Sequence, residues 1–193
     1  MEKKLEQRKF AKEILSKMGS ETQFEKSQKI ANNLSDFLTH LKNTKFRSLK
    51  KLGIGAFCPI QNEVVWYLNM KNSAYEFCFP KTNKDKTMSF YSVTLPDFKD
   101  MNWGASIPEA LMVEEKENLD ITLTPGLLFA KNGERLGRGA GFYDRYLQNY
   151  SGITIGLAFE EQIVAEIATD KHDIKLDYII TDKCIYMCKG VNS

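Results

Sequence analysis

The sequence has few cysteines and almost no excess of charge of either sign. Four cysteines are spread through 193 residues, which excludes a disulfide scaffold and favours reduced, mostly buried thiols. The formal net charge of +2, from 27 basic and 25 acidic residues, is too small for the whole surface to attract a polyanion. Any anion site must therefore be local.

Long apolar runs are also missing. No stretch approaches the roughly 20 apolar residues of a membrane span, and the start, MEKKLEQRKFAKEI, contains no apolar signal segment. We therefore expect a cytoplasmic protein with no membrane partner. Hydrophobic residues make up 42% and charged residues 27%, which is ordinary for a globular chain with one core. We expect a single domain over residues 1–193.

Apolar spacing predicts two helices in the first forty residues. Gly19 lies between them, and we expect it to end the first helix in the left-handed conformation, with Ser20 and Gln23 forming a capping box for the second. Two further helices are predicted over 63–71 and around 162–167. The apolar stripes of the first two are Phe10, Ile14 and Met18, then Phe24, Ile30, Leu34, Phe37, Leu38 and Leu41.

Short apolar runs between the helices predict buried strands. Strands alternating with helices are typical of an α/β fold, a three-layer α/β/α sandwich with a mainly parallel central sheet. The stretch 96–118 is expected to be irregular with a short helix. The predicted strands lie at 52–57, 75–79, 88–93, 119–129 (interrupted by Pro125 and Gly126), 153–159 and 178–181.

A glycine-rich segment precedes an apolar and aromatic helix. In KNGERLGRGAGFYDRYL, residues 131–147, three glycines alternate with Arg138 and Ala140. Glycine lets backbone N–H groups approach an anion closely, and a helix N-terminus adds partial positive charge. The segment predicts a phosphate cradle, and the alternative is a flexible surface loop.

Charged residues complete this candidate site. Arg135 and Arg138 supply fixed charge for phosphate oxygens, and Asp144 is placed to hold a cation or to stabilise the helix start. The segment is not G-x-G-x-x-G, because Phe142 stands at the third glycine position, and no Walker Gly-Lys-Ser/Thr follows. A dinucleotide fold and a P-loop enzyme are therefore not supported.

The segment TPGLLFAKNGERLGRGAGFYDRYL, residues 124–147, resembles the signature of 5-formyltetrahydrofolate cyclo-ligases, also called 5,10-methenyltetrahydrofolate synthetases. The resemblance extends to the basic first helix, the loop 59–63, IPEA at Ile107, LAFEEQ at Leu157 and HDIKLDYIITD at His172. It implies an α/β/α fold and the ATP-dependent closure of 5-formyltetrahydrofolate to 5,10-methenyltetrahydrofolate, with release of ADP and phosphate.

The formyl oxygen of the implied substrate is a poor leaving group, and in the implied reaction ATP activates it. The γ-phosphoryl group moves to the formyl oxygen, N10 attacks the activated carbon, and phosphate departs. Catalysis is then chiefly positioning and charge neutralisation, which suits a chain without a nucleophile motif. The implied partners are ATP, Mg²⁺ and 5-formyltetrahydrofolate with or without a polyglutamate tail, and we expect a monomer.

The resemblance also implies which residues bind ATP. Lys4 and Arg8, four residues apart on one helix face, would contact the phosphates, although alone they are typical of a solvated basic face. Lys4, Arg8 and Arg138 would be the catalytic cations. The ATP-binding loop would comprise Arg135, Leu136, Gly137, Arg138, Gly139, Ala140, Gly141, Phe142 and Tyr143.

Fewer residues are implied for the folate and the metal. Glu63 would accept hydrogen bonds from the pterin, and Cys58 would line the neighbouring position, unless it is only a small buried side chain. Asp144 and Asp173 would coordinate Mg²⁺, although Asp173 alone is typical of a turn. The loop residues beside the formyl group would be Arg138, Gly139, Ala140, Gly141 and Phe142.

Four positions depart from the family pattern, among them Phe142 in place of a frequent tyrosine and Ala110 in place of a proline. Many relatives have Lys at the position of Ala140, so weaker ATP binding or slower turnover would follow. Trp103 lies two residues farther from the IPEA motif than a folate-stacking aromatic residue of some relatives, and it is given no role.

Two other functions remain open at this point. One is a nucleic-acid-binding domain of the same fold, motivated by the basic segments 42–51 and 81–86, but a net charge of +2 is modest for such a protein. The other is an ATP-dependent enzyme that acts on another pterin or amide. We expect no nucleic-acid partner.

Overall fold

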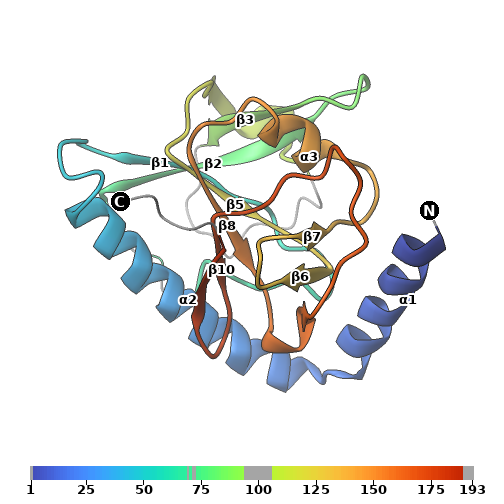
Figure 1. Ribbon diagram of the computed structural model, residues 1–193. Helices are drawn as coiled ribbons and strands as arrows, with labels where there is room; N and C mark the ends of the chain where they lie inside the picture. The colour runs from blue at the N-terminus through green and yellow to red at the C-terminus, as the bar shows by residue number, and fades with distance from the viewer. Residues whose placement is uncertain (1, 69, 71–72, 94–105, 189–193) are drawn as a thin grey trace.

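The computed structural model describes residues 2–68, 70, 73–93 and 106–188. Two helices, α1 (Glu2–Lys17) and α2 (Ser20–Asn43), open the chain; in Figure 1, α2 runs along the lower left of the molecule and α1 lies at its lower right. Ile30, Leu34, Leu38 and Leu41 of the apolar stripe of α2 are buried in the main core, as a 3.6-residue period predicts, whereas Phe24 is exposed. None of the described helices is both long and apolar enough to cross a bilayer.

An eight-stranded sheet forms the centre, in the order β11-β10-β8-β5-β1-β2-β3-β4. The five strands from β10 to β2 run parallel to their neighbours, whereas β11, β3 and β4 pair antiparallel at the two edges. The predicted mainly parallel sheet is therefore confirmed. The strands are β1 (Leu52–Gly55), β2 (Tyr75–Thr82), β3 (Met88–Val93), β4 (Met112–Glu115), β5 (Ile121–Thr124), β8 (Ile153–Leu157), β10 (Tyr178–Ile180) and β11 (Ile185–Met187).

A second, three-stranded sheet carries the glycine-rich loop. Its order is β7-β6-β9, from β6 (Leu128–Ala130), β7 (Arg135–Leu136) and β9 (Ile163–Val164). β6 and β7 form an antiparallel hairpin, so the loop begins where β7 ends. Two short 3-10 helices, η2 (Glu109–Leu111) and η3 (Glu160–Gln162), precede β4 and β9.

The helix α3 (Phe142–Leu147) covers the other face of the large sheet. Its Tyr146 packs against Phe90 of β3, with ring centroids 4.9 Å apart, and against a cluster that includes Cys78 and Leu119. Helices on both faces of the sheet agree with the predicted α/β/α layers. α3 also fixes the far end of the glycine-rich loop.

Two predicted helices are wrong. Described residues of 63–71 form turns that bury Val64 and Trp66, because Trp66 is anchored by a hydrogen bond from its Nε1 to the carbonyl oxygen of Phe57 (2.8 Å). The stretch 162–167 contains the end of η3 and then β9, which pairs with β6. Short apolar runs do not distinguish helices from other buried segments, so contacts with the rest of the fold determine which structure such a run adopts.

The bounds of two predicted segments, 119–129 and 96–118, also differ from the observed strands. The 119–129 run is two strands, β5 and β6, on either side of Pro125 and Gly126. β4 lies in a stretch that was expected to be irregular, because its backbone completes an antiparallel pair with β3. Residues 94–105, including Trp103, lie outside the described residues.

The junction between α1 and α2 differs from the predicted capping. Gly19 has φ −61° and ψ 151°, so it is the extended N-cap of α2 and not a left-handed end of α1. The side chain of Gln23 forms no capping box with Ser20; its Nε2 donates to the carbonyl oxygens of Leu15 and Met18, each at 3.1 Å. The inner face of α1 is also shifted, because Phe10 is exposed and Ala11 is buried.

We predict that Trp66→Phe lowers the free energy of unfolding by about 2 kcal/mol, because it removes buried ring volume and leaves the Phe57 carbonyl without its donor. Urea unfolding followed by circular dichroism measures this. Phe24→Leu, at a half-exposed position of α2, is the control, with an expected change below about 0.5 kcal/mol. Equal stability of Trp66→Phe and the wild type would contradict the anchoring role.

Candidate functional site

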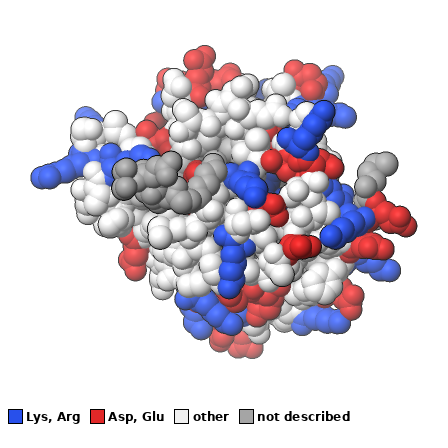
Figure 2. Space-filling model, viewed as in Figure 1, with Lys and Arg blue, Asp and Glu red and all other residues white. Residues whose placement is uncertain are grey.

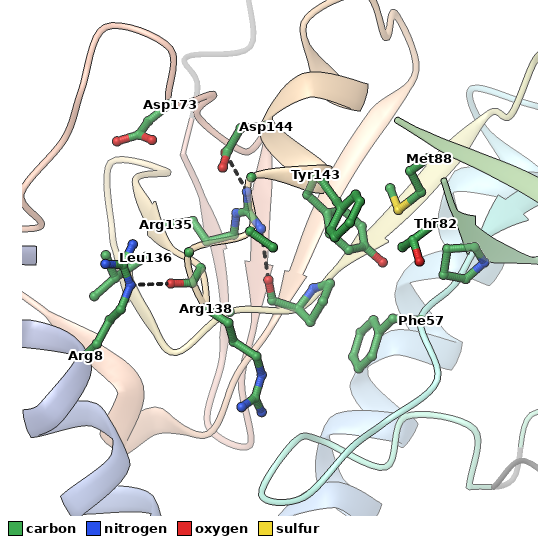
Figure 3. A pocket seen from close by; sticks show the side chains of 18 of the residues that line it. Arg8, Phe57, Thr82, Met88, Arg135, Leu136, Arg138, Tyr143, Asp144 and Asp173 are labelled. Atoms are coloured by element: carbon green, nitrogen blue, oxygen red, sulfur yellow. Dashed lines mark hydrogen bonds and ion pairs between the residues drawn. The ribbon is translucent and has the colours of Figure 1, made fainter. Parts of the chain in front are cut away.

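A cavity of about 530 Å³ lies between the glycine-rich loop, α1 and the ends of β1 and β2 (Figure 3). Every residue that the sequence analysis placed in a site lines this cavity. Segments distant in sequence therefore meet in one place. Those residues are Lys4, Arg8, Cys58, Glu63, Arg135, Leu136, Gly137, Arg138, Gly139, Ala140, Gly141, Phe142, Tyr143, Asp144 and Asp173.

The glycine-rich loop needs glycine at two of its positions. Gly139 and Gly141 have φ of 109° and 71°, a region that strains other residues. A Cβ atom on Gly139 would lie 3.5 Å from the guanidinium of Arg8, whose Nε donates to the carbonyl oxygen of Gly137 (3.0 Å). The loop backbone and a cation from α1 therefore approach each other closely.

Arg135 is a buried support for Asp144. Its NH2 is 2.6 Å from Asp144 Oδ1, and its NH1 donates to the carbonyl oxygen of Pro125 (3.1 Å). The guanidinium also lies over the ring of Tyr143, 5.6 Å from the centroid. The side chain of Arg135 is only 3% exposed. Its main role is therefore to hold the Asp144 carboxylate and the Tyr143 ring of α3 in position.

Arg138 joins the loop to the 59–63 segment. Its Nε donates to Glu63 Oε1 (3.0 Å), and Glu63 Oε2 accepts from the backbone N–H of Ile60 (3.1 Å). Burial raises the pKa of Glu63, and the hydrogen bond from Ile60 and the charge of Arg138 only partly oppose this. The side chain of Arg138 is 42% exposed, so it can turn toward a ligand.

Lys4 lies between two carboxylates, one of which the sequence analysis missed. Its Nζ is 2.5 Å from Asp173 Oδ2 and 2.8 Å from Asp170 Oδ2. Burial lowers the pKa of Lys4, but the hydrogen bonds and charges of the two aspartates outweigh burial and raise it overall. Lys4 is therefore a charged ammonium. No sequence signal distinguished Asp170 from an ordinary turn residue.

The carboxylates of Asp144 and Asp173 fit a magnesium ion that keeps several non-protein ligands. Each has one oxygen engaged, Asp144 Oδ1 by Arg135 and Asp173 Oδ2 by Lys4, and the other oxygen has no hydrogen-bond partner among the described residues. No group of three or more His, Cys, Asp or Glu residues that could hold a metal occurs in the described ranges. Two carboxylates completed by water and phosphate oxygens suit Mg²⁺.

The other end of the cavity is apolar. Phe57, Ile60, Pro80 and Met88, from the ends of β1, β2 and β3, form its wall, and Figure 3 shows Phe57 and Met88 across from Tyr143. Sequence reasoning missed these residues, although parallel strands place their carboxyl ends at one edge of a sheet, where ligands bind. This wall suits a flat aromatic ligand.

Two groups on this side are held neutral by burial. Burial and then the charge of Glu63 raise the pKa of Cys58 to about 12, so it is a thiol and not a nucleophile at neutral pH. Burial also raises the pKa of Tyr143, whose hydroxyl has no partner among the described residues. That hydroxyl is available to a ligand group.

Residues 1–182 match the model of the 5-formyltetrahydrofolate cyclo-ligase family. The 5-formyltetrahydrofolate cyclo-ligase of Mus musculus is 47% identical over 68 residues, 32% of this chain and 34% of that protein. The chain therefore spans about a third of that curated relative in the aligned region.

Two solved structures resemble the whole chain. The 5,10-methenyltetrahydrofolate synthetase of Mycoplasma pneumoniae has a TM-score of 0.72 with 26% identity, covering 93% of this chain and 98% of that one. The 5,10-methenyltetrahydrofolate synthetase of Aquifex aeolicus has a TM-score of 0.73 with 25% identity, covering 98% and 95%.

We predict that iodoacetamide at about pH 8 spares Cys58, because a thiol with a pKa of about 12 is almost entirely protonated. All four cysteines are free, and the exposed Cys184 should react first. Cys58 and Cys78 are buried and Cys188 is half-buried, so the expectation of mostly buried thiols fails only at Cys184. Peptide mass spectrometry identifies the labelled residues. Labelling in urea is the control, and fast labelling of Cys58 in the folded protein would contradict the neutral thiol.

Proposed function

The chain belongs to the 5-formyltetrahydrofolate cyclo-ligase family, and on that premise we propose that it converts 5-formyltetrahydrofolate and ATP to 5,10-methenyltetrahydrofolate, ADP and phosphate. The observation that carries the proposal is the Arg138–Glu63 pair, at 3.0 Å, inside one cavity. It places the glycine-rich loop, a candidate phosphate-binding loop, in contact with the largely buried carboxylate of Glu63. Both substrates would meet there.

The nucleotide would bind along the loop. Backbone N–H groups of residues 137–141 and the cations Lys4 and Arg8 would contact the phosphates, and the close approach of Arg8 to Gly137 supports this arrangement. Lys4 would exchange its aspartate partners for a phosphate oxygen. These residues bind and orient the nucleotide and neutralise its charge.

Asp144 and Asp173 would hold Mg²⁺, which when bound would neutralise negative charge on the transferring phosphates. The chain contributes the fixed position of the two carboxylates. Arg135 keeps Asp144 in place through a buried contact of 2.6 Å, and the backbone N–H of Asp170 donates to Asp173 Oδ2 (2.7 Å). This support is independent of the metal.

The folate would occupy the apolar end. Glu63 would accept hydrogen bonds from pterin N–H groups, next to Cys58 and opposite Tyr143. Arg138 would then lie between the formyl oxygen and the γ-phosphate, where it neutralises charge as the oxygen is phosphorylated. N10 attack on the activated carbon expels phosphate. A cavity of about 530 Å³ is in the range of small-molecule sites.

The nucleic-acid alternative is not favoured. On the face shown in Figure 2, basic and acidic side chains are interspersed, and no single-sign surface marks a path for a phosphate backbone. A related enzyme that acts on another pterin or amide remains the second candidate, because the phosphate half of the site contains more charged groups than the folate half. Cytoplasmic location, the monomeric state and acceptance of a polyglutamate tail stay predictions.

We predict that the purified protein forms the methenyl product from 5-formyltetrahydrofolate only when both ATP and Mg²⁺ are present. The near-ultraviolet absorbance of the product follows the reaction, with ATP-free and Mg²⁺-free controls. Glu63→Gln separates the two candidates, since loss of a pterin acceptor should raise the KM for the folate about ten-fold and leave the KM for ATP unchanged. A flat trace with the wild type, or an unchanged folate KM in the variant, would contradict the folate assignment.

We predict that Asp173→Asn raises the Mg²⁺ concentration needed for half-maximal turnover about ten-fold or more, because a neutral amide is a weaker ligand for a hard cation. Asp170→Asn is the matched control, since Asp170 contacts the same Lys4 at 2.8 Å but is not a proposed metal ligand. Titration of Mg²⁺ at saturating ATP measures both. Equal shifts in the two variants would show that both act only through Lys4.

A further inference from the structure

The inner face of α1 changes character along its length. Ala11 and Leu15 are buried in the core, whereas the half-buried positions nearer the N-terminus are Lys4, Gln7 and Arg8. Figure 1 shows this end of α1 at the margin of the molecule. The half of α1 that carries the two proposed phosphate cations is therefore held by polar contacts and not by core packing.

Gln7 makes two of these contacts. Its Nε2 donates to the carbonyl oxygen of Glu166 (2.9 Å), and its Oε1 accepts from the backbone N–H of Ala168 (2.9 Å). Residues 166–170 form neither helix nor strand, so the Gln7 amide satisfies backbone groups that no regular structure pairs. Gln7 therefore joins α1 to residues 166–168, which lead directly to Asp170 and Asp173.

The two hydrogen bonds of Gln7 differ from the neighbouring contacts of α1 because they join uncharged groups. The contacts of Lys4 with Asp170 and Asp173 are ion pairs that a bound phosphate or cation would weaken by competing for the same charges. The pair of Lys3 with Glu166, at 3.7 Å, is exposed and contributes little. The two hydrogen bonds of Gln7 do not compete with ligand charge, so they persist when the site is loaded.

We propose that Gln7 is a positioning residue that holds Lys4 and Arg8 at a fixed distance from Asp173 when nucleotide binds. Figure 3 shows Arg8 and Asp173 approaching the loop from the same side, and Gln7 joins the two elements that carry them. The inference rests on the proposed function, because it assumes that these cations meet the phosphates of MgATP. It assigns a role to a side chain that does not line the cavity.

Gln7→Met tests this role. Methionine keeps the length and helix propensity of glutamine but makes neither hydrogen bond. Gln23→Met is the control, because Gln23 donates to the backbone carbonyls of Leu15 and Met18 at the other end of α1 and to Asn62 Oδ1 (3.3 Å), on the folate side and not the nucleotide side of the site. Calorimetric titration with MgATP gives the Kd, steady-state kinetics give the KM for each substrate, and hydrogen exchange reports the Ala168 amide.

We expect Gln7→Met to raise the Kd and KM for MgATP about five-fold or more, with the KM for the folate unchanged and faster exchange at Ala168. Gln23→Met should lower the melting temperature without changing the Kd. If Gln7→Met does not fold, Gln7→Ala with the same measurements replaces it. An unchanged Kd in a folded Gln7 variant, or an equal rise with Gln23→Met, would overturn the positioning role alone. Wild-type protein that binds no MgATP would overturn the proposed function as well.

Discussion

Pairing of opposite charges within one cavity is the interaction on which this structure depends. Three cations of the site contact a carboxylate of the same site: Lys4 with Asp173, Arg135 with Asp144 and Arg138 with Glu63. Removing charges from water is costly unless they are paired, so these groups can be half-buried only together. The pairs therefore make it possible to assemble a charged site inside the fold before any ligand arrives.

These pairs also join parts of the chain that are far apart in sequence. Lys4 belongs to the first helix and Asp173 to a segment near the other end, yet they are 2.5 Å apart. The ion pair and the two hydrogen bonds of Gln7 join these segments. A ligand that carries both phosphate and a cation would replace the Lys4–Asp173 pair with two new pairs, phosphate with Lys4 and the cation with Asp173, so charge balance would be kept on binding.

Local chemistry explains which parts of the structure could be predicted from the sequence. Gly139 and Gly141 require a backbone that only glycine adopts easily, so the loop was identified from residue types alone. The central strands followed from short apolar runs. The glycine-rich loop and the resemblance it carries led to the predicted site residues, all of which line one cavity. Their roles stay predictions.

Tertiary contacts explain what could not be predicted. Val64, Val65 and Leu68 have helical spacing, but burial of the Trp66 ring and its hydrogen bond to Phe57 favour turns. Asp170 and the apolar wall around Phe57 and Met88 gain their significance only from segments that pack beside them. Gln7 lies on a face that looks merely basic in sequence, and its partners are backbone groups, which no residue pattern reveals.

The anchoring of the glycine-rich loop at both ends has a consequence for binding thermodynamics. Leu136 is held by the hydrogen bond from the Leu127 N–H (2.8 Å), and Arg145 donates to the carbonyl oxygens of Ala140 (2.7 Å) and Lys86 (2.8 Å). A loop restrained in this way loses little conformational entropy when an anion enters. Most of its interaction energy is then retained as affinity.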